Sequence, residues 1–315
     1  MNRRDFLKFG GIFSMAFLLS GCEKVETAKS DENFKENYEE KNSKISEVYM
    51  TKEISPQSLV KIYRALNVEP AGKIAVKIST GEPGSNYLRP ELIQDLIFTL
   101  NDATIVECNT IYGRFRGNTE SHLKVAEQHG FTKIARVEIM DAEGNITLPV
   151  KNGESIKENF VGKTFKNYNY FIILSHFKGH TMAGFGGAIK NTSIGIASAR
   201  GKGNIHGNNF IESMSEAAKS VSDALNGKIL YINVMNRLSL DCDCEENPRE
   251  PDIHDIGILS SLDAVALDQA CVDLIKTAPN SENFVKQIKN LQGERTLKHG
   301  EKIGLGSRKY KLIEI

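Results

Sequence analysis

Two kinds of hydrophobic pattern alternate along the chain from Ala71 onward. Short runs rich in β-branched residues predict buried strands, and they lie at 73–79 (KIAVKIS), 104–108 (TIVEC), 170–175 (YFIILS) and 228–235 (KILYINVM). Apolar residues at helical spacing predict the intervening helices, which begin near Pro90, Ser121, Phe210 and Asp263. Strands and helices in this alternation predict an α/β fold, with a mainly parallel sheet flanked by helices.

Chemically active residues follow three of the predicted strands. Cys108-Asn109-Thr110 begins at the end of the second strand, the segment 175–191 (SHFKGHTMAGFGGAIKN) begins where the third ends, and the segment 241–244 (DCDC) follows the fourth. The carboxyl ends of parallel strands meet at one edge of a sheet, and ligands of such folds gather there. The three segments therefore occupy equivalent places, and a shared pocket is the arrangement to test.

The first 22 residues have the layout of an export signal. Arg3 and Arg4 precede an apolar run at 9–19, which is shorter than the roughly 20 residues that a membrane span needs. Small residues at 20–21 then stand before Cys22. These patterns resemble a twin-arginine signal and a lipoprotein cleavage box, so we expect export by the twin-arginine route and a lipid anchor on Cys22, at the periplasmic or outer face of the cell envelope. The alternative is a plain secretory signal that ends near an accidental cysteine.

Residues 23–47, the main part of the segment 23–50, are charged and nearly free of large apolar side chains, so they cannot bury enough surface to fold alone. We expect them to form a disordered tether. It would join the lipid anchor, and through it the membrane, to a single α/β domain over 51–315.

The segment 241–244 combines two thiols with two carboxylates. If it continues the preceding strand, its period of two puts Cys242 and Cys244 on one face and both aspartates on the other. Two thiolates side by side suit a soft metal ion, zinc or iron. Exported proteins also meet oxidants, so either cysteine can instead pair with Cys108 or Cys271, or the two with each other. Metal and disulfide both stay open.

Three histidines lie near the same predicted edge. His176 and His180 would be one turn apart in a helix, as paired metal ligands often are, but the glycines around them argue against a regular helix. His206, in the stretch RGKGNIHG, adds a third imidazole. We expect a metal site at Cys242 and Cys244 that one or two of these histidines complete. The alternative for each histidine is a hydrogen-bonded polar group of the fold.

The glycine cluster of the third segment offers bare backbone amides at an expected helix N-terminus, where phosphates and carboxylates bind. The cluster lacks the spacing of a nucleotide-binding P-loop. Nucleic acid is not favoured either, because 40 basic residues are offset by 40 acidic ones and leave no basic face. Close packing of a turn would use the same glycines. The predicted site for a small anionic ligand consists of Lys178, Gly186, Gly187, Lys190 and Asn191.

The motifs follow one another as they do in a known family. ECNTIYGRFRGNTESHLKVAEQHGF, SHFKGHTMAGFGGAIKN with the later GKGNIHG, DCDC, and DIGILSSLDAVALDQACVDLI together resemble the domain-of-unknown-function family 362, whose members are described as uncharacterised iron-sulfur centre proteins. The resemblance covers roughly 72–277. It implies motif positions beyond the residues named above, at Asn109, Tyr112, His122, Asp241 and Asp263.

One departure from the family bears on the cofactor. Many members carry a ferredoxin-like insert with repeated Cys-x-x-Cys motifs after the segment that matches His206, whereas this chain passes directly into the helix near Phe210. The iron-sulfur cluster that the family implies is therefore in doubt.

The sequence leads to two functional hypotheses. The first is an exported, lipid-anchored protein with a metal site and an adjoining anion pocket, in which the metal acts as a Lewis acid or a redox centre. The second is a non-catalytic binding or accessory lipoprotein with a structural disulfide. The reaction and the substrate stay open in both.

Overall fold

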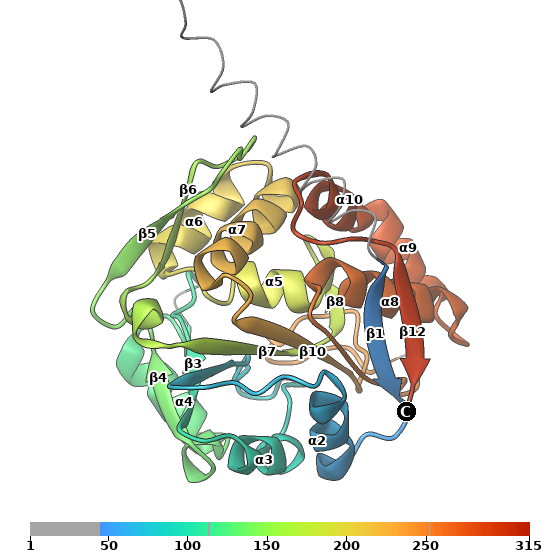
Figure 1. Ribbon diagram of the computed structural model, residues 1–315, viewed down its shortest axis with the longest axis horizontal. Helices are drawn as coiled ribbons and strands as arrows, with labels where there is room; N and C mark the ends of the chain where they lie inside the picture. The colour runs from blue at the N-terminus through green and yellow to red at the C-terminus, as the bar shows by residue number, and fades with distance from the viewer. Residues whose placement is uncertain (1–44, 113, 252) are drawn as a thin grey trace, which may run out of the picture. The chain divides into compact units, whose positions relative to one another are not determined.

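The computed structural model describes residues 45–112, 114–251 and 253–315 (Figure 1). The predicted signal and Cys22 lie outside the described residues. An eight-stranded sheet runs through the fold in the order β12-β1-β11-β10-β7-β2-β3-β4. Its strands are β1 (Ser46–Thr51), β2 (Ile74–Lys77), β3 (Ala103–Glu107), β4 (Arg136–Ile139), β7 (Tyr170–His176), β10 (Ile229–Met235), β11 (Gly257–Ser261) and β12 (Tyr310–Glu314).

The sheet is mainly parallel, as the alternation predicts. Strands β10, β7, β2, β3 and β4 run in one direction, and β12 is parallel to β1. Strand β11 is antiparallel to both of its neighbours. The carboxyl ends of β2, β3, β7 and β10 therefore share one edge. Two short ribbons complete the strands, β5 (Asn145–Pro149) with β6 (Glu158–Gly162) and β8 (Lys178–His180) with β9 (Gly184–Gly186).

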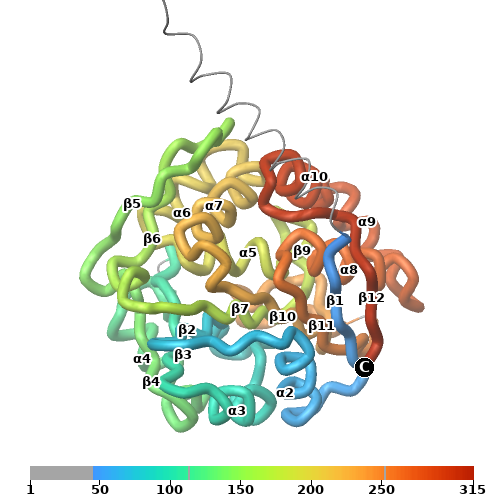
Figure 2. Tube along the Cα trace, viewed as in Figure 1, coloured from blue at the N-terminus to red at the C-terminus, as the bar shows by residue number. Residues whose placement is uncertain are grey.

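Helices cover both faces of the sheet (Figures 1 and 2). One face carries α2, α3 and α4, and the other carries α5, α7 and α8. The helices are α2 (Pro56–Ala65), α3 (Pro90–Thr99), α4 (Thr119–Gln128), α5 (Ala188–Ser193), α6 (Ala199–Gly207), α7 (Phe210–Leu225), α8 (Ala264–Thr277), α9 (Glu282–Asn290) and α10 (Glu294–Lys302), with 3₁₀ turns at Phe131–Lys133 and Lys163–Asn167. In the described part of the chain, no helix combines the length and apolar character that crossing a membrane requires.

Alternate residues of β7 supply the cores on the two faces. Phe171 and Ile173 belong to the core that includes α5, α7 and α8. Ile172 and Leu174 belong to the core that includes α2 and α3. All four side chains are fully buried, which is why this strand reads as a continuous apolar run.

Side-chain caps mark the start of several helices. Asp263 accepts hydrogen bonds from the Val265 and Ala266 amides at the start of α8, as expected for an N-cap. Ser55 caps α2 ahead of Pro56, and Asn118 caps α4. Each cap therefore defines the residue at which its helix begins.

The tether predicted over 23–50 ends earlier than expected. Ser46–Thr51 forms strand β1, which pairs with β11 and β12 inside the main sheet. Val48 and Met50 point to one face of the strand and are buried there, whereas Tyr49 between them is only partly buried. The folded domain therefore includes residues that composition alone assigns to the tether.

Candidate functional site

A cavity of about 90 Å³ lies at the carboxyl ends of β2, β3, β7 and β10. The three segments that follow the predicted strands all contribute to its lining. Cys108 and Thr110 come from the β3 end, His176 and Lys178 from the β7 end, and Cys242 from the loop after β10. The shared pocket that the sequence left to be tested is present.

The lining of the cavity is strongly cationic. Five basic side chains face a single carboxylate, that of Glu107; the five are Lys77, Arg116, Lys178, Lys190 and Lys202. Three of the five have acidic partners. Arg116 Nε donates to Glu82 at 2.9 Å, Lys77 Nζ lies 4.0 Å from Glu107, and Lys178 pairs with Asp243.

Lys190 and Lys202 differ from the other three. Lys202 Nζ donates to the backbone oxygens of Ala197 at 2.6 Å and Cys108 at 3.4 Å. Lys190 Nζ has Cys242 Sγ as its hydrogen-bonding partner, at 3.8 Å. Neither ammonium group has a carboxylate within 4.0 Å among the residues that the structure describes. The cavity therefore holds two buried amino groups for which the described residues supply no acidic partner.

The pKa values of the lysines respond to this environment. Burial, followed by repulsion from Lys178, lowers the pKa of Lys190 to about 7. Burial also lowers the pKa of Lys202, and it lowers that of Lys77 to about 8 although Glu107 opposes the shift. An anion in the cavity would raise all three values, since an opposite charge favours the protonated form.

The glycine turn does not present a free helix N-terminus to the cavity. The Ala188 and Ile189 amides, which begin α5, donate to the buried Asp268 carboxylate at 2.7 and 2.9 Å. A Cβ at Gly187 would collide with that carboxylate. The prediction that these amides bind the anion is wrong, because an aspartate from α8 already occupies them. Close packing, the alternative, explains Gly187.

Two other predicted anion-site residues line the cavity in supporting roles. Gly186 faces the stem of Lys190, where a Cβ would crowd the lysine Cδ at 3.1 Å, so its missing side chain leaves room for Lys190. The Asn191 carboxamide donates to the backbone oxygens of Lys77 and Leu174, both at 3.2 Å, and accepts from Lys77 Nζ at 2.9 Å. Asn191 therefore ties the ends of β2 and β7 together and orients Lys77.

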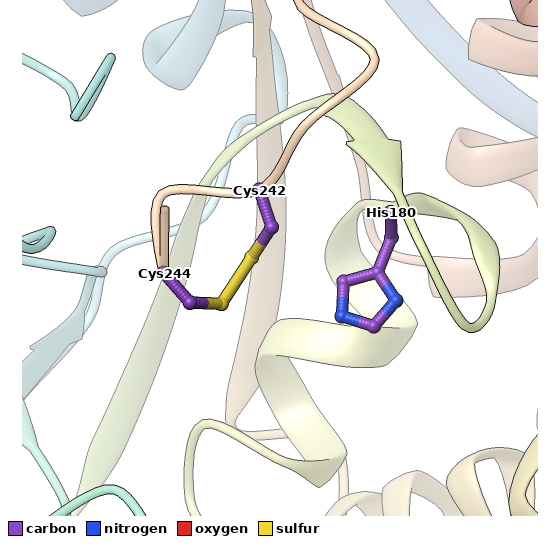
Figure 3. A group of neighbouring side chains, drawn as sticks. All are labelled: His180, Cys242 and Cys244. Carbon is purple, nitrogen blue, oxygen red and sulfur yellow. A yellow bond between two sulfur atoms is a disulfide. The ribbon is translucent and has the colours of Figure 1, made fainter. Parts of the chain in front are cut away.

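The two cysteines of the 241–244 segment form a disulfide with each other (Figure 3). The segment is a turn and not the strand extension on which the period-of-two argument depended, and the turn brings the two Cα atoms to 5.1 Å. That spacing lies within the usual range for a disulfide. Cys108 and Cys271 are buried free thiols. The disulfide alternative is therefore confirmed in its within-pair form.

The carboxylates of this segment point elsewhere. Asp243 is buried between Lys178 and His176, with His176 Nδ1 at 3.0 Å. Lys178 and His176, through their charge interactions and hydrogen bonds with the carboxylate, hold the pKa of Asp243 well below its usual range despite its burial. Asp241 forms a two-pronged pair with Arg249 at the surface. The sulfurs thus face the cavity while the aspartates anchor the turn.

His176 does not join the cysteines as a metal donor. Its Nδ1 contacts Asp243, and its Nε2 lies 2.7 Å from the Asn236 backbone oxygen. Both ring nitrogens are therefore engaged, and the expectation of His176 as a ligand is not met. His206 lines the cavity, with Nδ1 bonded to the Lys202 backbone oxygen at 2.7 Å and its ring stacked on Phe210. It too lies outside the cysteine group.

His180 is the histidine that lies beside the disulfide. One donor atom from each of His180, Cys242 and Cys244 lies within 4.8 Å of the others, so this group could hold a metal ion. Figure 3 shows one ring nitrogen turned toward the sulfurs and the other turned toward the β8–β9 turn. The latter, Nδ1, accepts from the Ala183 amide at 3.0 Å and the Met182 amide at 3.3 Å.

This hydrogen bonding sets the tautomer of His180. Burial, with Lys190 as the next cause, lowers the pKa of His180 well below its ordinary value, so the ring is neutral. A neutral ring whose Nδ1 accepts hydrogen bonds carries its proton on Nε2. The nitrogen that faces the sulfurs is then a hydrogen-bond donor. A metal ion would need that proton displaced and the disulfide reduced.

Sequence reasoning missed Lys77, Glu107 and Arg116. Each of the first two is the last residue of a strand that is otherwise apolar, IAVK for β2 and ATIVE for β3. A charged residue at the carboxyl end of a buried parallel strand is the signal that could have identified them. Arg116 lies in a loop without such a pattern. His122 and Asn109, implied by the resemblance, lie next to the cavity and contact each other at 3.3 Å.

Comparisons with known proteins add the following. No curated protein matches the chain. Among solved structures, the lactate racemase apoprotein from Thermoanaerobacterium thermosaccharolyticum is 17% identical over 60% of this chain and 51% of its own, with a TM-score of 0.37. A protein from Thermotoga maritima is 13% identical over 78% of this chain and 58% of its own, with a TM-score of 0.39. The chain therefore spans little more than half the length of each.

A family model decides the relationship. The model described as "Domain of unknown function (DUF362)" matches residues 74–273, which include the cavity-forming ends of β2, β3, β7 and β10. The match covers more than half of the chain, and its limits agree with the span of the resemblance seen in the motifs. The chain belongs to the DUF362 family.

Proposed function

We propose that this protein binds a small molecule with more than one negative charge, carried by carboxylate or phosphate groups, in the cavity at the sheet edge. The observation that carries the proposal is the pair of buried lysines, Lys190 and Lys202, that line the cavity without an acidic partner among the described residues. Burying an ammonium group is expensive unless an opposite charge accompanies it. An anionic ligand supplies that charge.

The remaining lining residues fit this role. Arg116 offers planar donors suited to carboxylate or phosphate. Its Nε donates to Glu82, while its Nη1 lies 3.4 Å from Ser79 Oγ, another residue of the cavity lining. Lys77 is held in place by Asn191. Glu107 accepts a hydrogen bond from the Thr80 hydroxyl. His122, Arg116 and Lys77 hold its pKa well below the usual range, although its burial opposes this shift.

Calorimetric titration with pyrophosphate and with citrate tests the proposal. The full chain should bind at least one of the two probes. Because a hydrogen bond to a charged group contributes roughly 1.5–3 kcal/mol, Lys190→Gln and Lys202→Gln should each weaken binding about 10- to 100-fold. Lys298→Gln removes the same charge from an exposed position on α10 and should leave affinity unchanged. Failure of both probes to bind, or equal affinity in all four proteins, would contradict the proposal.

A second function is favoured by the close group of His180, Cys242 and Cys244, whose donor atoms lie within 4.8 Å. As a dithiol this group offers two soft sulfur donors and one imidazole, which suits zinc or iron and leaves one tetrahedral position to a non-protein ligand. The bound ion would supply Lewis-acid chemistry, or redox chemistry if it is iron. An iron-sulfur cluster held by four cysteines is not proposed, since the described residues bring only Cys108 in addition to this pair into the lining.

Metal content separates the oxidised from the reduced protein. After incubation with Zn²⁺ and removal of the excess, the reduced chain should retain close to one ion, and the disulfide form should retain none. Cys242→Ser with Cys244→Ser should abolish retention, whereas Cys271→Ser, a buried thiol outside the cavity, should not. Equal metal content in both redox states would argue against this site.

Export and lipidation are proposals that the N-terminal sequence alone supports. The twin arginines at 3–4 and the small residues before Cys22 motivate them. Membrane fractionation of cells that express the full chain and its Cys22→Ser variant is the test. The parent chain should sediment with membranes, and the variant should be released into the soluble exported fraction.

A further inference from the structure

The disulfide at the cavity is asymmetric in its exposure. Cys242 is 6% exposed, whereas Cys244 is only partly buried, although both line the cavity. A thiol that approaches from solvent therefore meets Cys244 first. Attack at Cys244 makes Cys242 the leaving sulfur.

The surroundings of Cys242 favour its release. Lys190 Nζ lies 3.8 Å from Cys242 Sγ. The His180 ring lies beside the same pair of sulfurs (Figure 3). When the S–S bond breaks, negative charge develops on Cys242 Sγ beside Lys190 Nζ, which has no carboxylate within 4.0 Å among the described residues and is protonated more readily next to a negative charge. Disulfide exchange is faster when the leaving thiolate is stabilised in this way.

The disulfide contributes little to holding the turn in place. It closes a ring of three residues, and a disulfide constrains the unfolded chain least when its loop is shortest. The turn is anchored independently, by the Glu82 amide on the Asp243 backbone oxygen at 2.9 Å and by the Asp243 carboxylate on Lys178. The Gly179 amide also donates to the Ser239 backbone oxygen at 2.8 Å. Reduction can therefore proceed without unfolding the site.

We propose that the Cys242–Cys244 disulfide is a redox-active centre that accepts two electrons from thiols, and that the reduced pair competes with a bound anion for Lys190. The first part stands on the unequal exposure of the two cysteines and on the contact between Lys190 and Cys242, while the second rests on the proposed anion-binding function. The chemistry balances as two thiols plus the protein disulfide giving two protein thiols plus the disulfide of the reductant.

The exchange has two steps. A reductant thiolate attacks Cys244 Sγ, which forms a mixed disulfide and releases Cys242 as a thiolate beside Lys190. A second reductant thiolate then attacks the reductant's sulfur in the mixed disulfide, which releases Cys244 and forms the oxidised reductant. The two protons lost by the reductant thiols are available to the two protein sulfurs through solvent.

The competition for Lys190 links redox state to binding. In the disulfide form Lys190 is available to the anion, whereas in the reduced form the Cys242 sulfur shares it. Linkage is reciprocal, so an anion that prefers the oxidised form must also make the disulfide harder to reduce by the same factor. We expect reduction to lower the affinity for the anion about tenfold, and the bound anion to shift the reduction equilibrium about tenfold toward the disulfide.

Equilibration of the folded full chain with mixtures of reduced and oxidised glutathione tests the redox part. Alkylation and mass spectrometry count the free thiols, and circular dichroism monitors the fold. The pair should reach equilibrium with glutathione while the protein stays folded, whereas a structural disulfide resists this couple. Lys190→Gln should shift the equilibrium about tenfold toward the disulfide, and Lys298→Gln should not shift it. A disulfide that opens only after unfolding overturns the proposal.

Single-cysteine variants test the direction of attack. Cys242→Ser leaves the more exposed Cys244 and should acquire a glutathione adduct with oxidised glutathione. Cys244→Ser leaves the buried Cys242 and should acquire it at least tenfold more slowly. Equal rates, or the reverse order, overturn the assignment of Cys244 as the attacked sulfur.

Pyrophosphate or citrate, whichever binds, tests the competition. Affinity should fall about tenfold on reduction in the parent chain, and Lys190→Gln should abolish this difference. Equal affinities in the two redox states overturn the competition for Lys190. If the oxidised chain binds neither probe, the proposed function fails, while equilibration with glutathione still supports the redox centre on its own.

Discussion

The two walls of the cavity handle buried charge in different ways. The β3 wall, formed by Thr80, Glu82, Glu107, Arg116 and His122, is a network in which each charge has an opposite partner. The α5 wall, formed by His180, Lys190, Cys242 and Cys244, has one cation, one neutral imidazole and a disulfide. We infer that the β3 wall stabilises the fold, and that the α5 wall retains uncompensated charge for a ligand or a reaction.

Breaking the β3 wall should have the largest effect. Glu107→Gln removes the buried carboxylate that contacts Arg116, His122 and Lys77, and leaves the buried Lys77 ammonium without an acidic partner among the described residues. The free energy of unfolding, measured with urea, should fall by about 3–5 kcal/mol. Glu120→Gln removes an exposed carboxylate from an i,i+4 pair with Lys124 and should change the free energy of unfolding by less than about 0.5 kcal/mol. Similar losses in both variants would remove the distinction between the walls.

Asp268 tests the support behind the α5 wall. Burial raises its pKa to about 6, above the value of the unfolded chain, although the Ile189, Asn233 and Ala188 groups that donate to it oppose the shift. A carboxyl group with a raised folded-state pKa contributes stability at low pH that is lost as the pH rises through about 6. The stability advantage of the parent over Asp268→Asn should therefore be larger at pH 4 than at pH 7, by up to about 3 kcal/mol. Urea unfolding at both pH values measures it, and an advantage that grows with pH would contradict the shift.

Removal of the disulfide should have a modest effect on stability. For a ring of three residues, the chain-entropy relation gives about 1.6 kcal/mol. Cys242→Ser combined with Cys244→Ser should lower the free energy of unfolding by no more than this amount, measured under oxidising conditions. A loss of several kcal/mol would show that the disulfide stabilises the fold. The α5 wall would then have the same structural role as the β3 wall.

The smallest effect should also have the opposite sign. Lys190→Met removes a charge that has no acidic partner in the described structure, so the unfolding free energy should stay constant or rise by roughly 1 kcal/mol while anion affinity falls. Arg116→Met on the other wall should instead destabilise the protein, because it removes the cation that pairs with the buried Glu82 carboxylate. Thermal unfolding without ligand compares the two variants. Destabilisation by both would show that Lys190 has a structural partner.

The fold and the edge that carries the site could be predicted because they depend on local patterns. Strands β2, β3, β7 and β10 are continuous apolar runs, and their chemically active neighbours follow directly in sequence. The boundary at β1 was missed because Ser46–Thr51 pairs with strands more than 200 residues away. Nothing in its local charge distinguishes it from the preceding segment.

The chemistry of individual site residues was harder to predict. The α5 amides are occupied by Asp268, which lies 80 residues further along the chain and has no local relation to the glycine cluster. The tautomer of His180 depends on the Ala183 and Met182 amides in a turn whose shape no periodicity specifies. His176 is not available as a metal ligand, because one ring nitrogen contacts Asp243 and the other contacts a backbone oxygen. Such assignments require three-dimensional contacts, whereas residue type alone leaves them open.

The approach of Gly179 to the loop after β10 has a consequence for mutational tolerance. A Cβ at this position would collide with the Leu240 backbone, so even alanine would push the 239–240 segment away from β8. That displacement would carry the cysteine turn out of the cavity while leaving every charged and sulfur-bearing side chain unchanged. A random-mutagenesis screen for function should therefore find that position 179 tolerates substitution as poorly as the two cysteines do, although glycine places no side chain in the site.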